Sequence, residues 1–183
     1  MEYAVISFPG EEHHLALDYR EFPYAGKFVS NNLGVAVARE EGELLAVASF
    51  NEDRSAGDTA RIRTISVRTD RQGEGIGTDL LAGLQRWLRD RGFERIRMAV
   101  NNPHAFQAAY KAGFCYTGEQ SGLSELVMEL PGMRSVAAYR AGMALFDDLV
   151  PEDMQTYVDE REHGDPPPMA SSPPVLTETS RAP

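Results

Sequence analysis

The sequence predicts an α/β fold in which helices flank a mixed β-sheet. Short apolar runs that are typical of strands alternate with longer segments whose apolar residues recur every three or four positions, as on one face of a helix. The chain has 183 residues, of which 42% are hydrophobic and 25% are charged. That length and composition suffice for a buried core without disulfides or structural metals. We expect one main domain over residues 1–130.

Three strands are predicted in the first part of this domain. The apolar runs at 35–38 and 44–50 are separated by Glu41-Gly42, which indicates a hairpin. Side chains alternate along residues 60–67, as expected for a further strand. The pattern before the hairpin is weaker, and residues 15–28 predict only a short, irregular helical region that is broken by a proline and a glycine.

Two helices and three more strands follow. Apolar residues share a helical face over residues 76–88, and Arg91-Gly92 is typical of a helix end. An asparagine and a proline at 102–103 are typical of an N-cap and a first turn, which predicts a second helix that ends at Gly113. The strands between and after these helices are expected at residues 95–100, 114–119 and 123–130.

Beyond the main domain, the sequence predicts a helical extension over residues 131–163 and a disordered tail over 164–183. Apolar residues from Val136 to Val150 recur at helical spacing, and Pro151 suits the first turn of a second, shorter helix. Their apolar faces have two interpretations, which are packing on the main domain and contact with a second copy in a homodimer. The tail is rich in proline, serine and threonine, and it has too little apolar surface to offset its ordering entropy.

The net charge and the apolar pattern indicate which kinds of binding partner the protein can have. The basic and acidic residues give a net charge of 18 − 28 = −10, which argues against a nucleic-acid partner and favours cationic ones. No apolar run approaches the roughly 20 residues that span a bilayer, so we expect no membrane partner. The first residues carry neither a basic region nor a long apolar stretch, and Cys115 is the only cysteine. We therefore expect no secretory signal and a cytoplasmic protein.

The strand at 60–67 runs into a glycine-rich turn that leads directly into the first helix. Gly73 and Gly75 allow a ligand to approach the backbone closely, and the first amides of a helix lack internal partners and carry partial positive charge. This arrangement predicts a pyrophosphate site. It does not match the Walker pattern, because no lysine follows the glycines, and Leu80 stands where a dinucleotide-binding turn needs glycine. A plain tight turn before a helix is the alternative.

Two motifs in this region together resemble those of the GNAT superfamily, the acetyl-CoA-dependent N-acetyltransferases. The first is Gln72-x-x-Gly75-x-Gly77, and the second is Asn102-x-x-Ala105 followed, after a helix, by Gly113-Phe114. The resemblance covers about residues 34–130. It implies a GNAT-like central mixed sheet whose parallel strands, here 60–67 and 95–100, splay apart. It also implies acetyl-CoA as the co-substrate.

The resemblance further implies roles for individual residues. The pyrophosphate of acetyl-CoA would lie on the turn and the start of the helix, at Gln72, Gly73, Glu74, Gly75, Ile76, Gly77 and Thr78. The pantetheine arm would meet the backbone of Ile65, Ser66 and Val67, and the Val67 amide would polarise the thioester carbonyl. Asn102 would lie near the thiol end, would act as a plain N-cap, or would do both.

Candidates for proton transfer are less well marked. In the family, a tyrosine in the second motif often protonates the leaving thiolate, but here that position is Ala109. Tyr110 lies one residue later, about 100° further round a helix, and it is the best general-acid candidate, with a packing role as the alternative. Glu52 is our first candidate for the general base. The alternatives are Glu125, His13, His14 and a chain of water molecules.

Three further features have a functional and a structural interpretation. Residues 19–27 mix aromatic and charged side chains with proline and glycine, so they either line an acceptor pocket or fill packing and turn positions. Arg61 and Arg63 either orient an acidic part of the acceptor or face solvent. Cys115 is expected to be a buried strand residue, because no Cys/His arrangement accompanies it. No metal site is expected.

These observations favour an N-acetyltransferase in which an amine attacks the thioester directly. Its acceptor is expected to be a small-molecule amine or a basic peptide. Two alternatives come from other functional classes. One is a module that binds acyl-CoA without catalysis, and the other is an assembly protein whose function lies in the C-terminal helices.

Overall fold

The computed structural model describes residues 1–11, 15–28, 32–122, 124–147 and 149–178. Within them it forms one mixed sheet in the order β6-β7-β5-β4-β3-β2-β1-β8, which confirms the predicted fold class. The strands are β1 (Glu2–Ser7), β2 (Gly34–Glu40), β3 (Glu43–Asp53), β4 (Ala56–Val67), β5 (Arg95–Val100), β6 (Cys115–Ser121), β7 (Glu125–Leu130) and β8 (Thr177–Glu178). The helices are α1 (Ile76–Asp90), α2 (Pro103–Lys111), α3 (Val136–Ala144) and α4 (Glu152–Glu162), with 3-10 turns η1 (Ala25–Phe28) and η2 (Thr69–Arg71).

The elements between residues 34 and 130 follow the predicted order, with the hairpin of β2 and β3 turning at Glu41 and Gly42. The sequence does not predict β1. This strand is held by antiparallel pairing with β2, from Glu2 opposite Arg39 onward, which is a contact between segments far apart in the chain. None of the helices that the structure describes is long and apolar enough to cross a membrane.

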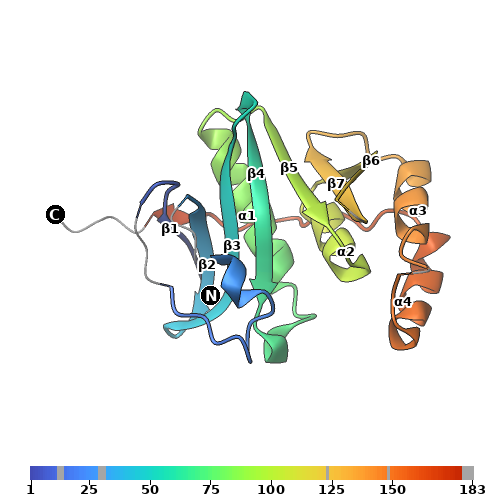
Figure 1. The fold of residues 1–183 in the computed structure, drawn as a ribbon, viewed down its shortest axis with the longest axis horizontal. Helices are drawn as coiled ribbons and strands as arrows, with labels where there is room; N and C mark the ends of the chain where they lie inside the picture. The colour runs from blue at the N-terminus through green and yellow to red at the C-terminus, as the bar shows by residue number, and fades with distance from the viewer. Residues whose placement is uncertain (12–14, 29–31, 123, 148, 179–183) are drawn as a thin grey trace.

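Apolar side chains pack on both faces of the sheet. On one face, Leu80 and Leu84 of α1 belong to the larger core, and Figure 1 shows this helix behind β3 and β4. On the other face, Phe22 and Phe28 pack with valines of β2 and β3. The segment 15–28, predicted as irregularly helical, therefore covers a sheet face and contains one short helical turn, η1.

β4 and β5 run parallel, but they separate partway along their length (Figure 1). Their pairing ends at Ile62 and Met98. At that point β4 carries a bulge in which Arg63 is the extra residue opposite β3. β5 continues beside β7 as far as Val100. The two parallel strands therefore splay apart, as the resemblance implies.

α3 and α4 lie together at the β6 end of the sheet (Figure 1). Tyr139 of α3 is buried, and its ring stacks on Phe106 of α2 with centroids 5.8 Å apart. A Cβ at Gly142 would lie only 2.6 Å from the Phe106 ring, so this glycine permits the close packing. α3 ends at Ala144, before Phe146, which is buried in the following turn. Pro151 was predicted in the first turn of the next helix, but it is the N-cap of α4. The apolar face thus packs on the chain's own domain, while a homodimer contact stays a prediction.

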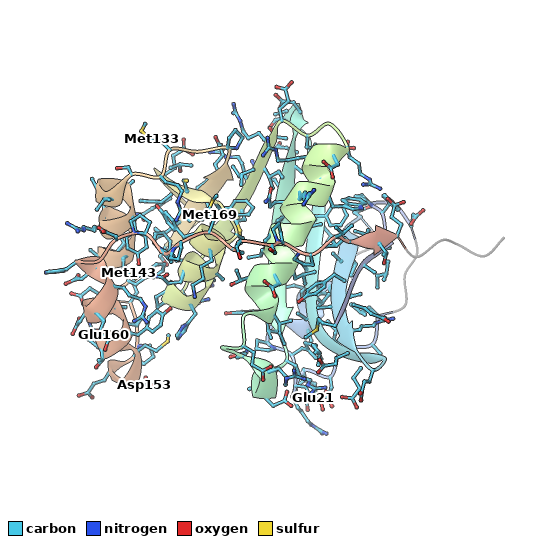
Figure 2. All side chains as sticks on the ribbon, turned by 180° about the vertical axis from the view of Figure 1, so that it is seen from behind. Glu21, Met133, Met143, Asp153, Glu160 and Met169 are labelled. Carbon is cyan, nitrogen blue, oxygen red and sulfur yellow. The ribbon has the colours of Figure 1, made fainter. Side chains whose placement is uncertain are left out.

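Residues 164–178, which we call the strap, differ from the disordered tail that the composition predicts. The strap crosses α1 and ends in β8, which pairs in parallel with β1; Figure 2 shows it from behind, with Met169 labelled. Leu176 is 7% exposed and fills the space that Gly83 leaves on α1, where a Cβ would lie 2.4 Å from its Cδ1. The Ala170 amide donates to the Lys111 carbonyl at 2.8 Å. A few such anchors order a proline-rich segment, and composition alone does not reveal them.

Candidate active site

The glycine-rich turn between β4 and α1 presents backbone amides to open space. Gly75 is the N-cap of α1 with a φ of 90°, and no side chain caps the helix there. The first hydrogen bond of the helix runs from the Asp79 amide to the Gly75 carbonyl, at 3.0 Å. The amides of residues 76–78 come before it and have no acceptor within the helix. A Cβ at Gly73 or Gly75 would meet no atom within 4 Å. An anion can therefore reach these amides at the end of the helix where the dipole favours it.

Gly77 brings the first turn of α1 close to the end of β4. A Cβ at this position would lie 2.9 Å from Cγ2 of Val67 and 3.7 Å from Cδ1 of Ile65. Glycine removes that conflict, because it has no side chain. The amides at the start of the helix consequently lie next to the backbone of the strand.

The backbone of β4 beyond the bulge faces the gap that β5 leaves. The Arg68 amide donates to the Leu45 carbonyl of β3 at 2.8 Å. Successive residues of a strand turn their backbone groups to opposite edges, so those of Val67 and Ile65 face away from β3. In agreement, Nε2 of Gln72 donates to the Val67 carbonyl at 3.2 Å. The Val67 amide therefore has the orientation that the resemblance requires.

The arginines beside the turn are already neutralised by carboxylates. Arg71 lies 2.9 Å from Glu74 and 3.1 Å from Glu40, and these contacts raise the pKa of its guanidinium. Arg68 has a similar pair of partners, Asp70 and Glu43. The Glu74 carboxylate is likewise engaged with Arg71, through contacts of 2.9 Å to its Nε. Anion binding at the turn thus depends mainly on backbone donors.

A pocket opens where β4 and β5 separate. Its walls include residues 62–65 of β4 and residues 98–102 of β5 and the turn that follows. Asn102 lines the pocket and also caps α2, since its Oδ1 accepts a hydrogen bond from the Ala105 amide at 2.8 Å. Its Nδ2 donates to Oδ1 of Asn101 at 3.3 Å. Its capping role is therefore confirmed, and the same residue lies at the pocket.

Tyr24 and Lys27, from the segment before β2, complete one wall of the pocket. The segment is tied to β4 because the Ser66 hydroxyl donates to the Pro23 carbonyl at 2.6 Å. The amide and the hydroxyl of Thr69 both donate to the Glu21 carbonyl at 2.8 Å. The side chain of Ser66 therefore anchors this wall, a role that sequence reasoning missed. The strand also carries arginine and threonine, so no local signal in the sequence marks Ser66 for this role.

Of the two glutamates considered as general base, only Glu125 lies at the pocket. It begins β7 and accepts a hydrogen bond from the Ser121 hydroxyl at 3.4 Å. Glu52 is exposed on β3 opposite Ala60, in the part of the sheet where β4 still pairs with β5. The geometry therefore favours Glu125 and does not bring Glu52 to the site.

Tyr110 is not among the residues that line the pocket. Its side chain is fully buried, and its hydroxyl accepts a hydrogen bond from the Tyr116 amide at 3.2 Å. The ring packs against Phe106 and Tyr139, each with centroids 5.0 Å away. Burial raises the pKa of the Tyr110 hydroxyl. These contacts give Tyr110 a packing role and argue against the predicted role as general acid, which stays an untested prediction.

The structure also locates the arginine and cysteine candidates. Arg63 lines the pocket, whereas Arg61 forms an ion pair with Asp53. Cys115 is buried, and burial raises the pKa of its thiol, in agreement with a structural role. His13 and His14 lie outside the described residues. Within those residues, no group of three or more histidine, cysteine, aspartate or glutamate side chains is arranged to hold a metal ion.

Solved acetyltransferases share this fold. An acetyltransferase from Bacillus subtilis in complex with CoA is 18% identical, with a TM-score of 0.56 over 72% of this chain and 99% of its own. An IAA acetyltransferase from Bacillus cereus ATCC 14579 is 19% identical, with a TM-score of 0.54 over 70% and 98%. Identities this low show the fold alone. No curated protein matches the chain.

The splayed strands lead from a charged pocket to a turn of free helix amides, which is the arrangement of a protein that binds an elongated, phosphate-bearing ligand. The sequence model of the acetyltransferase (GNAT) family matches residues 2–114, more than half of the chain. The chain belongs to the GNAT acetyltransferase family. The match ends before β6, so the extension and the strap lie beyond it.

Proposed function

We propose that this chain transfers the acetyl group of acetyl-CoA to an amine by direct attack. The observation that carries the proposal is the continuity of the site. The outward-facing backbone of Ile65 and Val67 connects the free amides of α1 with the pocket that holds Glu125. Membership of the GNAT family supports acetyl-CoA as the co-substrate, as does a neighbour of the same fold in complex with CoA.

The binding part of the proposal assigns one role to each stretch of backbone. The diphosphate is bound by residues 72–78, where side chains leave the amides open. The pantetheine arm lies along residues 65–67, in the gap beside β4. Its thioester end then reaches Asn102 and the pocket wall. The Val67 amide donates to the thioester carbonyl oxygen and stabilises the negative charge that develops there.

The reaction needs one proton to leave the acceptor before attack. Glu125, alone or through water, accepts this proton from the ammonium group. The free nitrogen then attacks the thioester carbonyl, so that a carbon–nitrogen bond forms and the carbon–sulfur bond breaks. The nitrogen loses a second proton, and the leaving thiolate takes one up. The products are the acetylated amine, the free thiol of CoA and one proton.

Thiol release from acetyl-CoA, measured with a panel of small amines and basic peptides, tests the proposal. We expect steady, amine-dependent release and an acetylated product detectable by mass spectrometry. If acetyl-CoA binds but no amine is acetylated, the chain is instead a non-catalytic acyl-CoA-binding module. The observation that favours this second candidate is that Tyr110 is buried and does not line the pocket.

The role of Glu125 can be separated from that of Glu52 by comparing two variants. We expect Glu125→Gln to lower kcat/KM for the amine by about tenfold or more, because the amide cannot accept the proton of the ammonium group. Since Glu52 lies away from the pocket, Glu52→Gln should change kcat/KM by less than about threefold. The reverse result would assign the base to Glu52.

We also propose that the protein acts in the cytoplasm.

A further inference from the structure

The pocket between β4 and β5 is lined by charged side chains of both signs. Three charged side chains line it, Lys27, Arg63 and Glu125, which amount to two cations and one anion. The whole chain has a net charge of −10, and Lys27 is one of only two lysines in it. The charged lining of the pocket is therefore net positive, although the chain as a whole is acidic.

The cations and the carboxylate come from opposite sides of the pocket. Arg63 is the extra residue of the β4 bulge, and Lys27 belongs to η1, which packs against the same strand. Glu125 begins β7, and β7 lies on the far side of β5 in the order β7-β5-β4. A molecule in the pocket would meet the two cations at one end and the carboxylate at the other.

Neither cation is neutralised within the part of the chain that the structure describes. Lys27 and Arg63 form no ion pair there, whereas Arg61, two residues away, pairs with Asp53. Nζ of Lys27 lies 5.0 Å from the centroid of the Tyr24 ring, which positions the ammonium group without cancelling its charge. Two uncompensated cations at one wall are available for charge-assisted hydrogen bonds to an anion.

The wall that carries Lys27 is also held in place before any ligand arrives. The hydrogen bond from Ser66 fixes Pro23, and Phe22 and Phe28 on either side are buried against the sheet. Preorganised charge loses less entropy on binding than charge on a loose loop. Lys27 and Arg63 are themselves exposed, so a ligand can reach both charges, while the backbone that carries Lys27 is held in place.

We infer that the acceptor is a small amine that also carries an anionic group, of which a free amino acid is the simplest case. This inference rests on the proposed function. The anionic group lies against Lys27 and Arg63, and the amine faces Glu125 and the thioester. A basic peptide would place further positive charge near these cations, so the pocket favours the small molecule, although the acidic surface attracts cations at long range.

Matched acceptors test the inference directly. We would compare kcat/KM for acetylation of free α-amino acids and ω-amino acids with the values for their primary amides, which keep the amine and lose the anion. We expect the carboxylate of each pair to be preferred by about tenfold or more. Equal or better acetylation of the amides would overturn the inference and leave the proposed function intact. If no amine is acetylated although calorimetry detects acetyl-CoA binding, the proposed function fails, and this inference fails with it.

Charge-removing variants then locate the preference. Lys27→Met and Arg63→Met should each lower kcat/KM for the carboxylates by about tenfold and change it by less than about threefold for the amides. Lys111→Met and Arg54→Met remove the same charges from exposed positions away from the pocket, and they should keep the wild-type preference. The KM for acetyl-CoA should be unchanged in all four. Equal effects of the pocket and control variants would overturn the inference.

Discussion

Gly75 and Gly42 have nearly the same left-handed backbone, with φ of 90° and 85°, but they lie in different turns. At neither position would a Cβ meet an atom within 4 Å. Alanine at either position therefore carries a similar backbone strain of about 1–2 kcal/mol. Only at Gly75 does the added methyl group enter the space in front of the α1 amides. The pair separates a local strain from a loss of ligand binding.

We expect Gly75→Ala to raise the KM for acetyl-CoA by about tenfold or more, because the methyl group keeps the diphosphate from the amides. Gly42→Ala should leave this KM within about twofold of the wild-type value. Both variants should lose similar stability in urea unfolding. If the two KM values agree, the turn does not bind the co-substrate.

Tyr110 offers a second test at the scale of one residue. Its hydroxyl accepts a hydrogen bond from the buried Tyr116 amide, so Tyr110→Phe leaves that donor unpaired at a cost of about 1–2 kcal/mol. We expect lower stability in chemical denaturation and a kcat within about threefold of the wild-type value. A kcat reduced by tenfold or more with unchanged acetyl-CoA affinity would restore Tyr110 as the general acid.

Among the elements, the strap is the one whose behaviour the sequence predicts least well. Leu176 is 7% exposed against α1, whereas its neighbour Val175 is 76% exposed. The two are adjacent apolar residues in the same proline-rich segment, so they would behave alike if the segment were disordered. Their different burial makes them a matched pair for testing whether the strap is part of the folded domain.

We expect Leu176→Ala to lower the free energy of unfolding by about 2–3 kcal/mol, because it removes buried apolar contacts and leaves a cavity over Gly83. Val175→Ala should change it by no more than about 0.5 kcal/mol. Urea unfolding followed by fluorescence measures both. Equal, small effects would mean that the composition-based prediction of disorder holds in solution.

The elements whose conformation depends on neighbouring residues in the chain could be predicted from the sequence. The hairpin at Glu41-Gly42, the capped start of α2 at Asn102 and the glycine-rich entry to α1 each depend on residues adjacent in the chain. β1, β8 and the strap could not be predicted, because each is held by partners far away in sequence. Short segments of modest apolarity adopt strand structure only when such a partner is present.

At the scale of the whole molecule, the order of strands decides which side chains share the site. Sequence reasoning named Glu52, at the end of one predicted strand, first, and Glu125, on the last predicted strand, as an alternative. The order β7-β5-β4-β3 and the parting of β4 from β5 bring only Glu125 to the pocket. Likewise, the motif predicted the turn and the splayed strands, but the pairing of Ser66 with Pro23 that fixes Lys27 there needs the tertiary structure.

The most direct test of the central claim is a crystal structure of the chain with CoA. We expect the diphosphate oxygens to lie about 3 Å from backbone amides between residues 73 and 77, with the pantetheine arm in the gap beside Val67. A diphosphate bound elsewhere, with the turn left to solvent, would contradict both the binding site and the activity that we propose.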